Sequence, residues 1–400
     1  MTITAPVPLV FSNDSLLRLQ IYQDQTDNIF QSNESCPDYI GSLHRLDCAE
    51  LMGSVSEFVA GTLKTDGIPI LRVLTKQGEH FQMQPMAKCF YRQMPRLLKV
   101  TQHLSPHYAY DEYISAFIAC AEKLGIYDAP VDWDSTCNGH HILSGLPETI
   151  HCVDIFNEFV AEIRTYCHAL KIKEKRRLRL REIDRRYQDL CEYVDCLFQS
   201  WNRLIVVRVD FFYANQFSEI VSIEQAQYDL KRLLDNRRTN TLFKGMRGYI
   251  WKLEYALKKG IHFHLIFFLD GAVRQPTSHV YFAKEIGEYW VKVITEGKGD
   301  YWNVNAEAKN YERLNRRGIG EIHQADASLR QHLEAFVIGY LCKADQFVRF
   351  KFKKRLRVIA RGEFPKREHR KPGPKSKRTL KIVSVRSPGL LKLCGGKQAP

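Results

Sequence analysis

The spacing of apolar residues changes once along the chain. Up to about residue 201, apolar residues recur every three or four positions, as in 111–124 and 166–201, which is typical of amphipathic helices. From residue 203 onward, short runs rich in β-branched and aromatic residues predict strands separated by helices. We therefore expect a mostly helical N-terminal region followed by a mixed domain.

The mixed domain is predicted to contain four strands and three helices. Residues 204–212 are almost continuously apolar, which is typical of a central strand. Ser222 and Gln225 form a capping box at the start of the next helix. Two later strands are separated by only five residues, which predicts a hairpin. In chain order, the elements are strand 204–212, helix 222–234, strands 248–255 and 261–269, helix 278–294, strand 320–323 and helix 327–347.

The order β-α-β-β-α-β-α favours an α+β fold. We expect a mainly antiparallel sheet with helices on one face, of the ferredoxin-like or RNA-recognition-motif-like kind. The chain divides accordingly into an N-terminal region of unknown role (1–165), a basic linking helix (166–201), the mixed domain (202–348) and a basic C-terminal arm (349–400). The arm turns Pro- and Gly-rich, and we expect it to be mobile from about residue 365.

The formal net charge of +14 is concentrated near the C-terminus. Residues 349–378 contain fourteen Lys or Arg residues and two Glu residues, which favours a polyanionic partner because each neutralised phosphate releases counterions. The linking helix carries a second basic run. A solubilising tail and a solvated helix face are the alternatives. The candidate nucleic-acid contacts in these segments and in the first strand of the mixed domain are Lys175, Arg176, Arg177, Arg179, Arg208, Lys351, Lys353, Lys354 and Arg355.

Composition narrows the class of protein. The chain is 44% hydrophobic and 12% aromatic, which is enough to bury a full core. It has no apolar run of about 18 residues and no signal-peptide pattern, so we expect a cytoplasmic protein without a membrane partner. The eleven cysteines include no CxxC pair, which indicates neither a disulfide framework nor a zinc ribbon.

Candidate chemistry begins with two histidines in the second strand of the predicted hairpin. His262 and His264 are separated by one residue, so both imidazoles project from the same face, about 7 Å apart at the backbone. Such a pair can share one metal ion. In a chain with fourteen histidines this pattern arises readily by chance, and a polar sheet face is the alternative.

Glu254 strengthens the metal hypothesis. It lies eight residues before His262 on the partner strand, so closing the hairpin over residues 256–260 brings it opposite His262 or a neighbour. Two imidazoles and a carboxylate leave coordination positions for water and a phosphate oxygen. This set suits Mn²⁺ or Mg²⁺ and does not exclude Zn²⁺.

The last predicted helix carries a candidate nucleophile. Tyr340 extends an apolar stripe that we expect to pack on the sheet, so its hydroxyl should face the strands. Lys343 lies three residues further on, beside Tyr340, where its ammonium could favour a phenolate or hold a phosphate. A tyrosine on such a stripe is otherwise an ordinary core residue.

Together these residues resemble a known superfamily. A Glu-bearing strand, then Ile261-His262-Phe263-His264, then Gly339-Tyr340-Leu341-Cys342-Lys343-Ala344-Asp345 is similar to the HUH endonucleases, named for His-hydrophobic-His, with their Tyr-x-x-Lys helix. Val207-Arg208-Val209-Asp210 and residues 340–346 look most like inovirus-type replication initiators, akin to the filamentous-phage gene II protein and the YagK/YfjJ proteins of prophages. The resemblance covers roughly residues 200–350.

The resemblance implies a rolling-circle replication initiator that nicks single-stranded or hairpin origin DNA. His262, His264 and Glu254 would bind a divalent metal, Mn²⁺ or Mg²⁺. Tyr340 would attack the scissile phosphate, and Lys343 would support the phosphotyrosine. The products would be a 5′-phosphotyrosine and a free 3′-hydroxyl for a host DNA polymerase. Because the chain has no P-loop motif, a host helicase would separate the strands.

The chain departs from the superfamily pattern at one position. Many initiators of this superfamily carry a second tyrosine on the same helix, four residues on, where this chain has Ala344. Strand closure after one round would then need a second subunit, a hydrolytic step or another tyrosine.

Two other functions fit the same residues. A non-catalytic nucleic-acid-binding module on the same sheet could use Tyr249, Trp251 and Phe263 as stacking surfaces. A relaxase or transposase of the same superfamily would use the same site residues. Relaxases usually place the tyrosine ahead of the histidines, whereas Tyr340 follows them, and this order favours an initiator or a single-tyrosine transposase.

Overall fold

The computed structural model of the chain describes residues 45–76, 78–104, 108–127, 133, 140–142, 149–218, 220–256, 260–273, 278–343, 348–351 and 356–365. All of them belong to one compact unit that extends to Pro365. They form three hydrophobic cores, one in the N-terminal region and one on each face of a sheet. The C-terminal arm from residue 366 on, which the sequence predicts to be mobile, lies outside the described residues.

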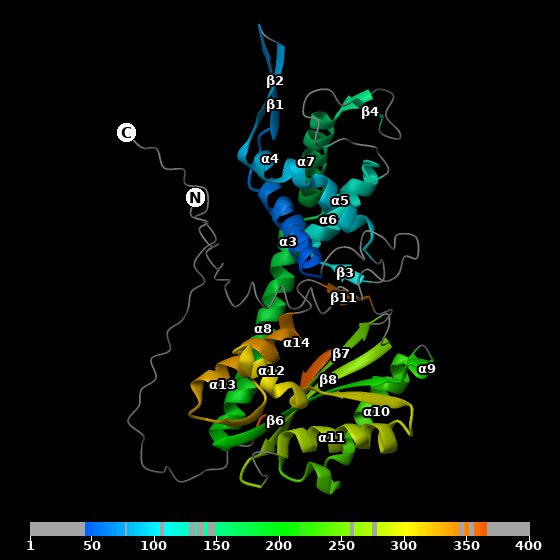
Figure 1. Ribbon diagram of the computed structural model, residues 1–400, viewed down its shortest axis with the longest axis vertical. Helices are drawn as coiled ribbons and strands as arrows, with labels where there is room; N and C mark the ends of the chain where they lie inside the picture. Colours follow the sequence, from blue (N-terminus) through cyan, green and yellow to red (C-terminus); the bar gives the residue numbers. More distant parts are fainter. Residues whose placement is uncertain are drawn as a thin grey trace, which may run out of the picture. The chain divides into compact units, whose positions relative to one another are not determined.

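The described part of the N-terminal region is mostly helical, as the spacing of its apolar residues predicts. Four helices enclose a core in which phenylalanines from three of them pack ring against ring. These helices are α3 (Arg45–Thr62), α5 (Met94–Gln102), α6 (Glu112–Lys123) and α7 (Cys152–Ala169) (Figure 1). The shorter elements are α4 (Pro85–Phe90), η1 (Tyr91–Gln93), β3 (Tyr108–Tyr110), β4 (His140–Ile142) and β5 (Thr149–His151).

A β-hairpin in this region was not predicted. Strands β1 (Ile70–Thr75) and β2 (Gly78–Met83) pair in antiparallel register. Only Ile70 of β1 is buried, and most of the strand is exposed. Such a strand has no buried face, so its sequence lacks the alternation that identifies a strand.

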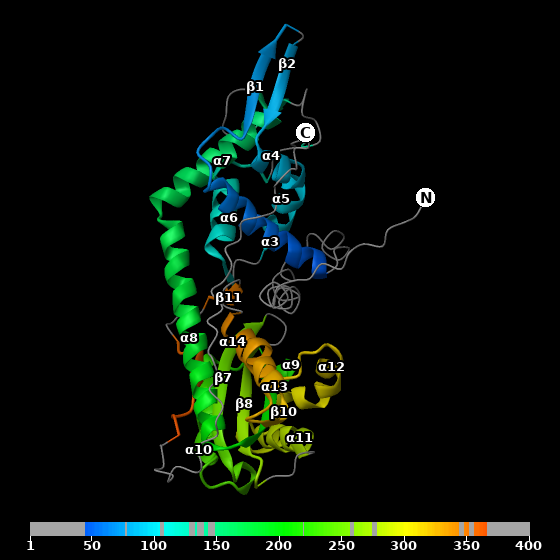
Figure 2. The same cartoon turned by 90° about the vertical axis from the view of Figure 1, so that its left-hand side faces the viewer.

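The single helix predicted over residues 166–201 is two helices. Helix α7 ends at Ala169, and α8 (Ile172–Ser200) begins after Lys171, whose φ of +52° is left-handed. A left-handed residue cannot continue a right-handed helix, so the chain changes direction there (Figure 2). No Gly or Pro marks the break, which is why the apolar spacing alone does not predict it.

The mixed domain is built on a six-stranded antiparallel sheet. Its order is β10-β6-β8-β7-β12, and β9 pairs with the same edge of β6 as β10. All four predicted strands are present within about two residues of their predicted ends, while β9 and β12 were not predicted. The strands are β6 (Arg203–Tyr213), β7 (Met246–Ala256), β8 (Gly260–Asp270), β9 (Gly299–Asn303), β10 (Gly320–His323) and β12 (Ile359–Arg361).

Helices cover both faces of this sheet. One face packs on α8 and on the helical run α13 (Ala327–His332), η6 (Leu333–Ile338) and α14 (Gly339–Lys343). The other packs on α10 (Ile223–Asn236), α11 (His279–Tyr289) and η4 (Trp290–Ile294), as Figure 1 shows. The remaining elements are α9 (Asn215–Ser218), η2 (Thr241–Phe243), η5 (Val304–Glu307), α12 (Ala308–Arg313) and β11 (Val348–Phe350).

The predicted α+β class with an antiparallel sheet is confirmed. The helical layer expected on one face is only part of the arrangement, because a second layer covers the opposite face. The reason is visible in β8, which is buried at every residue and is apolar on both sides apart from its two histidines and Asp270 at its end. A strand of that kind needs apolar cover above and below.

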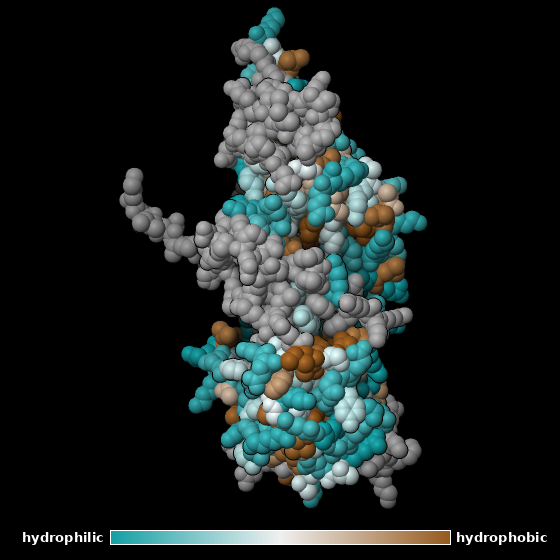
Figure 3. Space-filling model, turned by 90° about the vertical axis from the view of Figure 1, so that its right-hand side faces the viewer, coloured by the Kyte–Doolittle hydropathy of each residue, from teal (hydrophilic) through white to brown (hydrophobic). Residues whose placement is uncertain are grey.

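The surface of the sheet-bearing part is mixed in character. In the view of Figure 3, hydrophilic side chains predominate over it, with hydrophobic ones scattered among them. Across the described residues, no helix is both long enough and apolar enough to cross a membrane.

Two arginines of the basic helix tie α8 to α6. Asp111 caps α6 by accepting a hydrogen bond from Tyr113 N through Oδ1, and its Oδ2 accepts from Arg176 Nε at 3.0 Å. Arg179 forms a bidentate pair with Glu112, both contacts at 2.6 Å, and also reaches Asp111 at 3.4 Å. These guanidinium groups therefore neutralise carboxylates at the start of α6.

We expect Asp111→Ala to lower the free energy of unfolding by about 2–4 kcal/mol, because it removes a helix cap and leaves Arg176 without its buried carboxylate. Urea denaturation measures this change. The control is Glu122→Ala, at an exposed position in the last turn of the same helix, which should change stability by less than about 0.5 kcal/mol. Equal effects of the two substitutions would contradict the assignment.

Candidate metal centre and nucleophile

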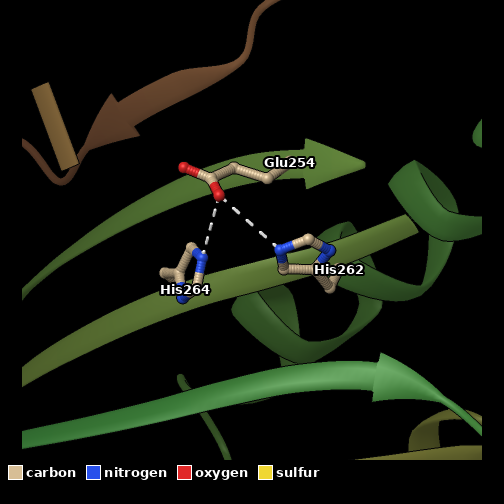
Figure 4. A group of neighbouring side chains, drawn as sticks. All are labelled: Glu254, His262 and His264. Atoms are coloured by element: carbon tan, nitrogen blue, oxygen red, sulfur yellow. Dashed lines mark hydrogen bonds and ion pairs between the residues drawn. The ribbon is translucent and has the colours of Figure 1, made fainter. Parts of the chain in front are cut away.

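Three potential metal ligands meet across the hairpin of β7 and β8. Glu254 pairs directly with His262 in the ladder, and His264 lies two residues further along the same face. Glu254 Oε2 is 3.3 Å from His264 Nε2 and 3.6 Å from His262 Nε2 (Figure 4). All three are shielded from solvent, with side chains about one-tenth exposed. The predicted register of Glu254 opposite His262 is therefore correct.

Hydrogen bonds fix which nitrogen each imidazole presents to the cluster. His262 Nδ1 lies 3.2 Å from the Gly260 carbonyl, which can only accept, so Nδ1 carries the proton. His264 Nδ1 lies 2.8 Å from Asp210 Oδ1. Both rings thus direct Nε2 toward Glu254. A carboxylate or carbonyl behind a histidine is the usual partner that orients a metal-binding imidazole.

Cations hold the two carboxylates in their charged form. Lys252 Nζ is 2.9 Å from Glu254 Oε1, and Arg208 Nε is 3.2 Å from Asp210 Oδ1. Burial alone would raise the pKa of Glu254, but Lys252 and His264 hold that pKa well below its ordinary value. Burial likewise opposes ionisation of Asp210, but Arg208 and His264 lower its pKa.

The same two carboxylates raise the pKa of His264. Burial alone would lower the pKa of its imidazole, but Asp210 and Glu254 on either side raise that pKa to about 9. Without a metal, the ring therefore carries a proton between two anions. The cluster is a place where positive charge is stabilised.

The spacing of these atoms fits a single divalent cation. Ligands held about 2.0–2.2 Å from one ion lie roughly 3.0–3.6 Å from each other in octahedral or tetrahedral arrangements. Both separations between Glu254 and the histidines fall in this range, and all ligand atoms lie within 4.8 Å of one another. Because Glu254 Oε1 faces Lys252, the carboxylate would offer Oε2 alone.

Tyr340 lies beside this cluster. Its ring centroid is 6.2 Å from that of His264, in an edge arrangement, and the guanidinium of Arg208 lies 5.4 Å from its ring. The residue is 6% exposed and belongs to the core on this face of the sheet. The predicted packing of Tyr340 on the strands is therefore correct.

The helix that carries Tyr340 is not a regular α-helix. Residues Leu333–Ile338 form a π-helical turn between α13 and α14. The wider turn buries Leu333, Val337 and Ile338, whereas Phe336 of the predicted stripe is only half-buried. The described helix ends at Lys343, and residues 344–347, which the prediction included, lie outside the described residues.

The other predicted site residues fall into four groups. Arg208 lies at the site, while Arg176 and Arg179 bind carboxylates of α6. The remaining exposed cations are Lys175, Arg177, which pairs with Glu174, and Lys351. The side chain of Lys343 and all of Lys353, Lys354 and Arg355 lie outside the described residues.

Two residues of the cluster were not predicted. Asp210 pairs with His264 across β6 and β8, and Lys252 pairs with His264 across β7 and β8. Both lie on the face of Glu254, at the two-residue spacing of a strand. The signal for Lys252 was present, since it precedes Glu254 by two residues. Asp210 could be assigned to the cluster only once β6 was known to lie beside β8.

This part of the chain is an α+β domain whose antiparallel sheet carries a Glu-His-His cluster next to a buried tyrosine. Residues 165–357 match the model of the YagK/YfjJ C-terminal domain family. The matched span includes α8, every strand of the sheet except β12, and the helix of Tyr340. The similarity therefore extends over the region that builds the candidate site. No curated protein and no solved structure matches the chain.

We expect Asp210→Asn to weaken Mn²⁺ binding about 10- to 100-fold, because the neutral amide no longer fixes His264 with Nε2 toward the cluster. Isothermal titration calorimetry measures the affinity. Asp300→Asn is the matched control, since Asp300 is an exposed residue of the same sheet. Urea denaturation of the metal-free variants checks that both fold. Unchanged Mn²⁺ affinity in a folded Asp210→Asn protein would contradict the orienting role.

Proposed function

We propose that this protein is a metal-dependent enzyme that nicks single-stranded DNA with Tyr340 as nucleophile and so initiates rolling-circle replication. The observation that carries the proposal is the meeting of three candidate metal ligands with a tyrosine: Glu254, His262 and His264 lie within 4.8 Å of one another, and Tyr340 contacts the ring of His264. A core tyrosine does not need such neighbours. A phosphoryl-transfer site does.

The reaction balances without another co-reactant. Tyr340 Oη forms a bond to phosphorus while the bond from phosphorus to the 3′-oxygen breaks. The phenolic proton passes to water, and the departing 3′-oxygen takes up a proton from water. The products are a 5′-phosphotyrosine and a free 3′-hydroxyl. The phosphodiester energy is retained in the phosphotyrosine, so the reverse attack rejoins the strand without ATP.

The chain's own residues supply binding and charge. Glu254, His262 and His264 would hold a divalent cation, Mn²⁺ or Mg²⁺, which when bound polarises the scissile phosphate. Arg208 lies over the Tyr340 ring, where its charge offsets the negative charge of a bound phosphate. Lys343 is the proposed support of the phosphotyrosine. Asp210 and Lys252 keep the ligands oriented and ionised.

An exposed aromatic residue next to the site supports a single-stranded substrate. Trp302 of β9 pairs directly with Asp210, so both side chains lie on the face that carries the cluster. The tryptophan is 55% exposed. Unpaired bases stack on exposed rings of this kind, whereas paired bases in a duplex are not available for such contact. The proposed partners beyond the origin DNA are a host helicase and a host DNA polymerase.

The non-catalytic alternative has less support in the structure. Of its three proposed stacking residues, Phe263 is fully buried and cannot contact a base. Tyr249 and Trp251 are half-buried on the sheet face opposite the cluster. A relaxase or transposase of the same superfamily would use the same Glu254, His262, His264 and Tyr340, and its distinction from an initiator lies in the DNA that is recognised.

We expect Tyr340→Phe to abolish the covalent protein–DNA adduct and to leave DNA affinity within about twofold, because only the attacking oxygen is removed. Denaturing gel electrophoresis of the protein with Mn²⁺ and labelled single-stranded origin DNA measures the adduct. Tyr281→Phe, at an exposed tyrosine of α11, is the control and should form the adduct normally. An adduct that persists in Tyr340→Phe would rule out this nucleophile.

We expect His262→Ala combined with His264→Ala to remove Mn²⁺-dependent nicking, with a loss of at least about a hundredfold, because two of three ligands are lost. Initial rates with single-stranded origin DNA, with and without chelator, measure the effect. His80→Ala with His168→Ala removes the same number of imidazoles from exposed positions elsewhere and should be silent. Undiminished cleavage by the site variant would exclude the proposed metal centre.

A further inference from the structure

Two hollows adjoin the short edge strand β12, away from the metal cluster. The first, of about 980 Å³, lies between α10, the first half of β7 and the segment after β12. The second, of about 480 Å³, lies between α8 and β12. Arg357 and Arg361 line both, so the hollows form one groove around β12, which we call the β12 groove.

The walls of the β12 groove are rich in cations. The first hollow is lined by Lys231, Arg237, Arg238, Arg247, Arg357 and Arg361. The second adds Arg185 and Arg186. These eight cationic side chains face four carboxylates, from Asp235, Glu363, Glu182 and Asp189. Within the described residues, Arg185, Arg237, Arg238 and Arg357 form no ion pair, so the groove offers positive charge to a ligand.

Aromatic rings lie between these cations. Tyr249 and Trp251 line the first hollow and are half-buried, and Phe364 is 38% exposed at its edge. Two arginines lie against these rings: the Arg237 guanidinium is 4.9 Å from the Tyr249 ring, and that of Arg361 is 3.9 Å from Phe364. Stacking of this kind holds the guanidinium planes in fixed positions.

We propose that the β12 groove binds single-stranded DNA as a site separate from the metal cluster. Cations that follow a groove neutralise a phosphate backbone, and an exposed ring among them, here that of Phe364, stacks on an unpaired base. This combination distinguishes the groove from a solubilising charged surface, which needs no aromatic residues. It also disfavours a purely acidic protein segment as ligand, because such a segment would leave the rings unused.

The C-terminal residues are not suited to be the ligand. The residues after Pro365 contain many Lys and Arg residues and a single acidic one, Glu368, so their charge has the same sign as the groove. A phosphate backbone has the opposite sign. Charge complementarity therefore points to nucleic acid.

Strand β7 separates Trp251 from the metal cluster. Trp251 lines the groove, and Glu254, three residues further along the same strand, points to the opposite face of the sheet. The groove and the cluster are therefore distinct binding surfaces. Binding in the groove does not require cleavage, so it can be measured in the absence of divalent metal ions.

The test measures fluorescence anisotropy of a labelled single-stranded oligonucleotide with the full-length chain in EDTA, at several salt concentrations. We expect Arg185→Gln, Arg238→Gln and Arg357→Gln together to weaken binding at least about tenfold. The slope of log affinity against log salt should fall by about 2, from roughly 0.7 per lost phosphate contact. Arg92→Gln, Arg96→Gln and Arg313→Gln remove three exposed arginines elsewhere and should have little effect.

A second variant tests the aromatic contribution. We expect Phe364→Ala to weaken single-stranded DNA about tenfold and duplex DNA much less, because only unpaired bases stack on the ring. Circular dichroism confirms that each variant is folded. Equal loss in the groove and control triple variants, or no loss in the groove variant, would overturn the proposal. Preference for RNA, or for duplex DNA with Phe364→Ala silent, would overturn the choice of ligand.

The same assay with His262→Ala and His264→Ala separates this proposal from the nicking function. The β12 groove should bind DNA normally in that variant, because neither histidine lines it. If nicking fails in the native protein while groove-dependent binding persists, only the proposed function is wrong. If nicking occurs and the groove variants bind normally, only the groove assignment is wrong.

Discussion

The pairing register of β7 with β8 is the constraint on which the candidate site depends. Side chains alternate along a strand, so a slip of one residue would replace the two histidines on the site face with their apolar neighbours. Gly260 helps to fix the register at the hairpin: its φ of +63° is left-handed, and a Cβ there would lie 2.6 Å from the Ser218 carbonyl oxygen. The close backbone of Ser218 therefore leaves room only for glycine at this end of the hairpin.

This register also organises the charges. Arg208, Asp210, His264, Glu254 and Lys252 form a continuous series of close contacts, each between 2.8 and 3.3 Å, in which a carboxylate always lies next to a potential cation. Buried charges are costly unless they are paired and fixed by geometry. Here three adjacent strands hold the partners. The series ends in apolar packing on one side, where Ile250 and Ile266 continue the same face into the core.

Much of this arrangement could be predicted from the sequence, and the failures have physical causes. The hairpin, the placement of Glu254 opposite His262 and the packing of Tyr340 follow from two-residue and three-to-four-residue periodicities. Strand β9 could not be predicted in this way, because it is short and only Gly299 in it is buried. Asp210 could not be assigned to the cluster without the strand order, because a sequence does not state which strands are neighbours. The break at Lys171 carried no Gly or Pro signal.

The direction in which Tyr340 points depends on the number of residues in the helix before it, which includes the π-helical turn Leu333–Ile338. Each residue in an α-helix rotates the next by about 100°, and a π turn accommodates one residue more than an α turn. Deleting one residue within the turn would let the helix become regular and would leave Tyr340 pointing in nearly the same direction, because the wider turn absorbs that extra residue. A deletion in α13, where the helix is already regular, would instead rotate every following residue by about 100° and turn Tyr340 away from His264. A change of length is therefore tolerable at the π turn but not in the regular helix before it.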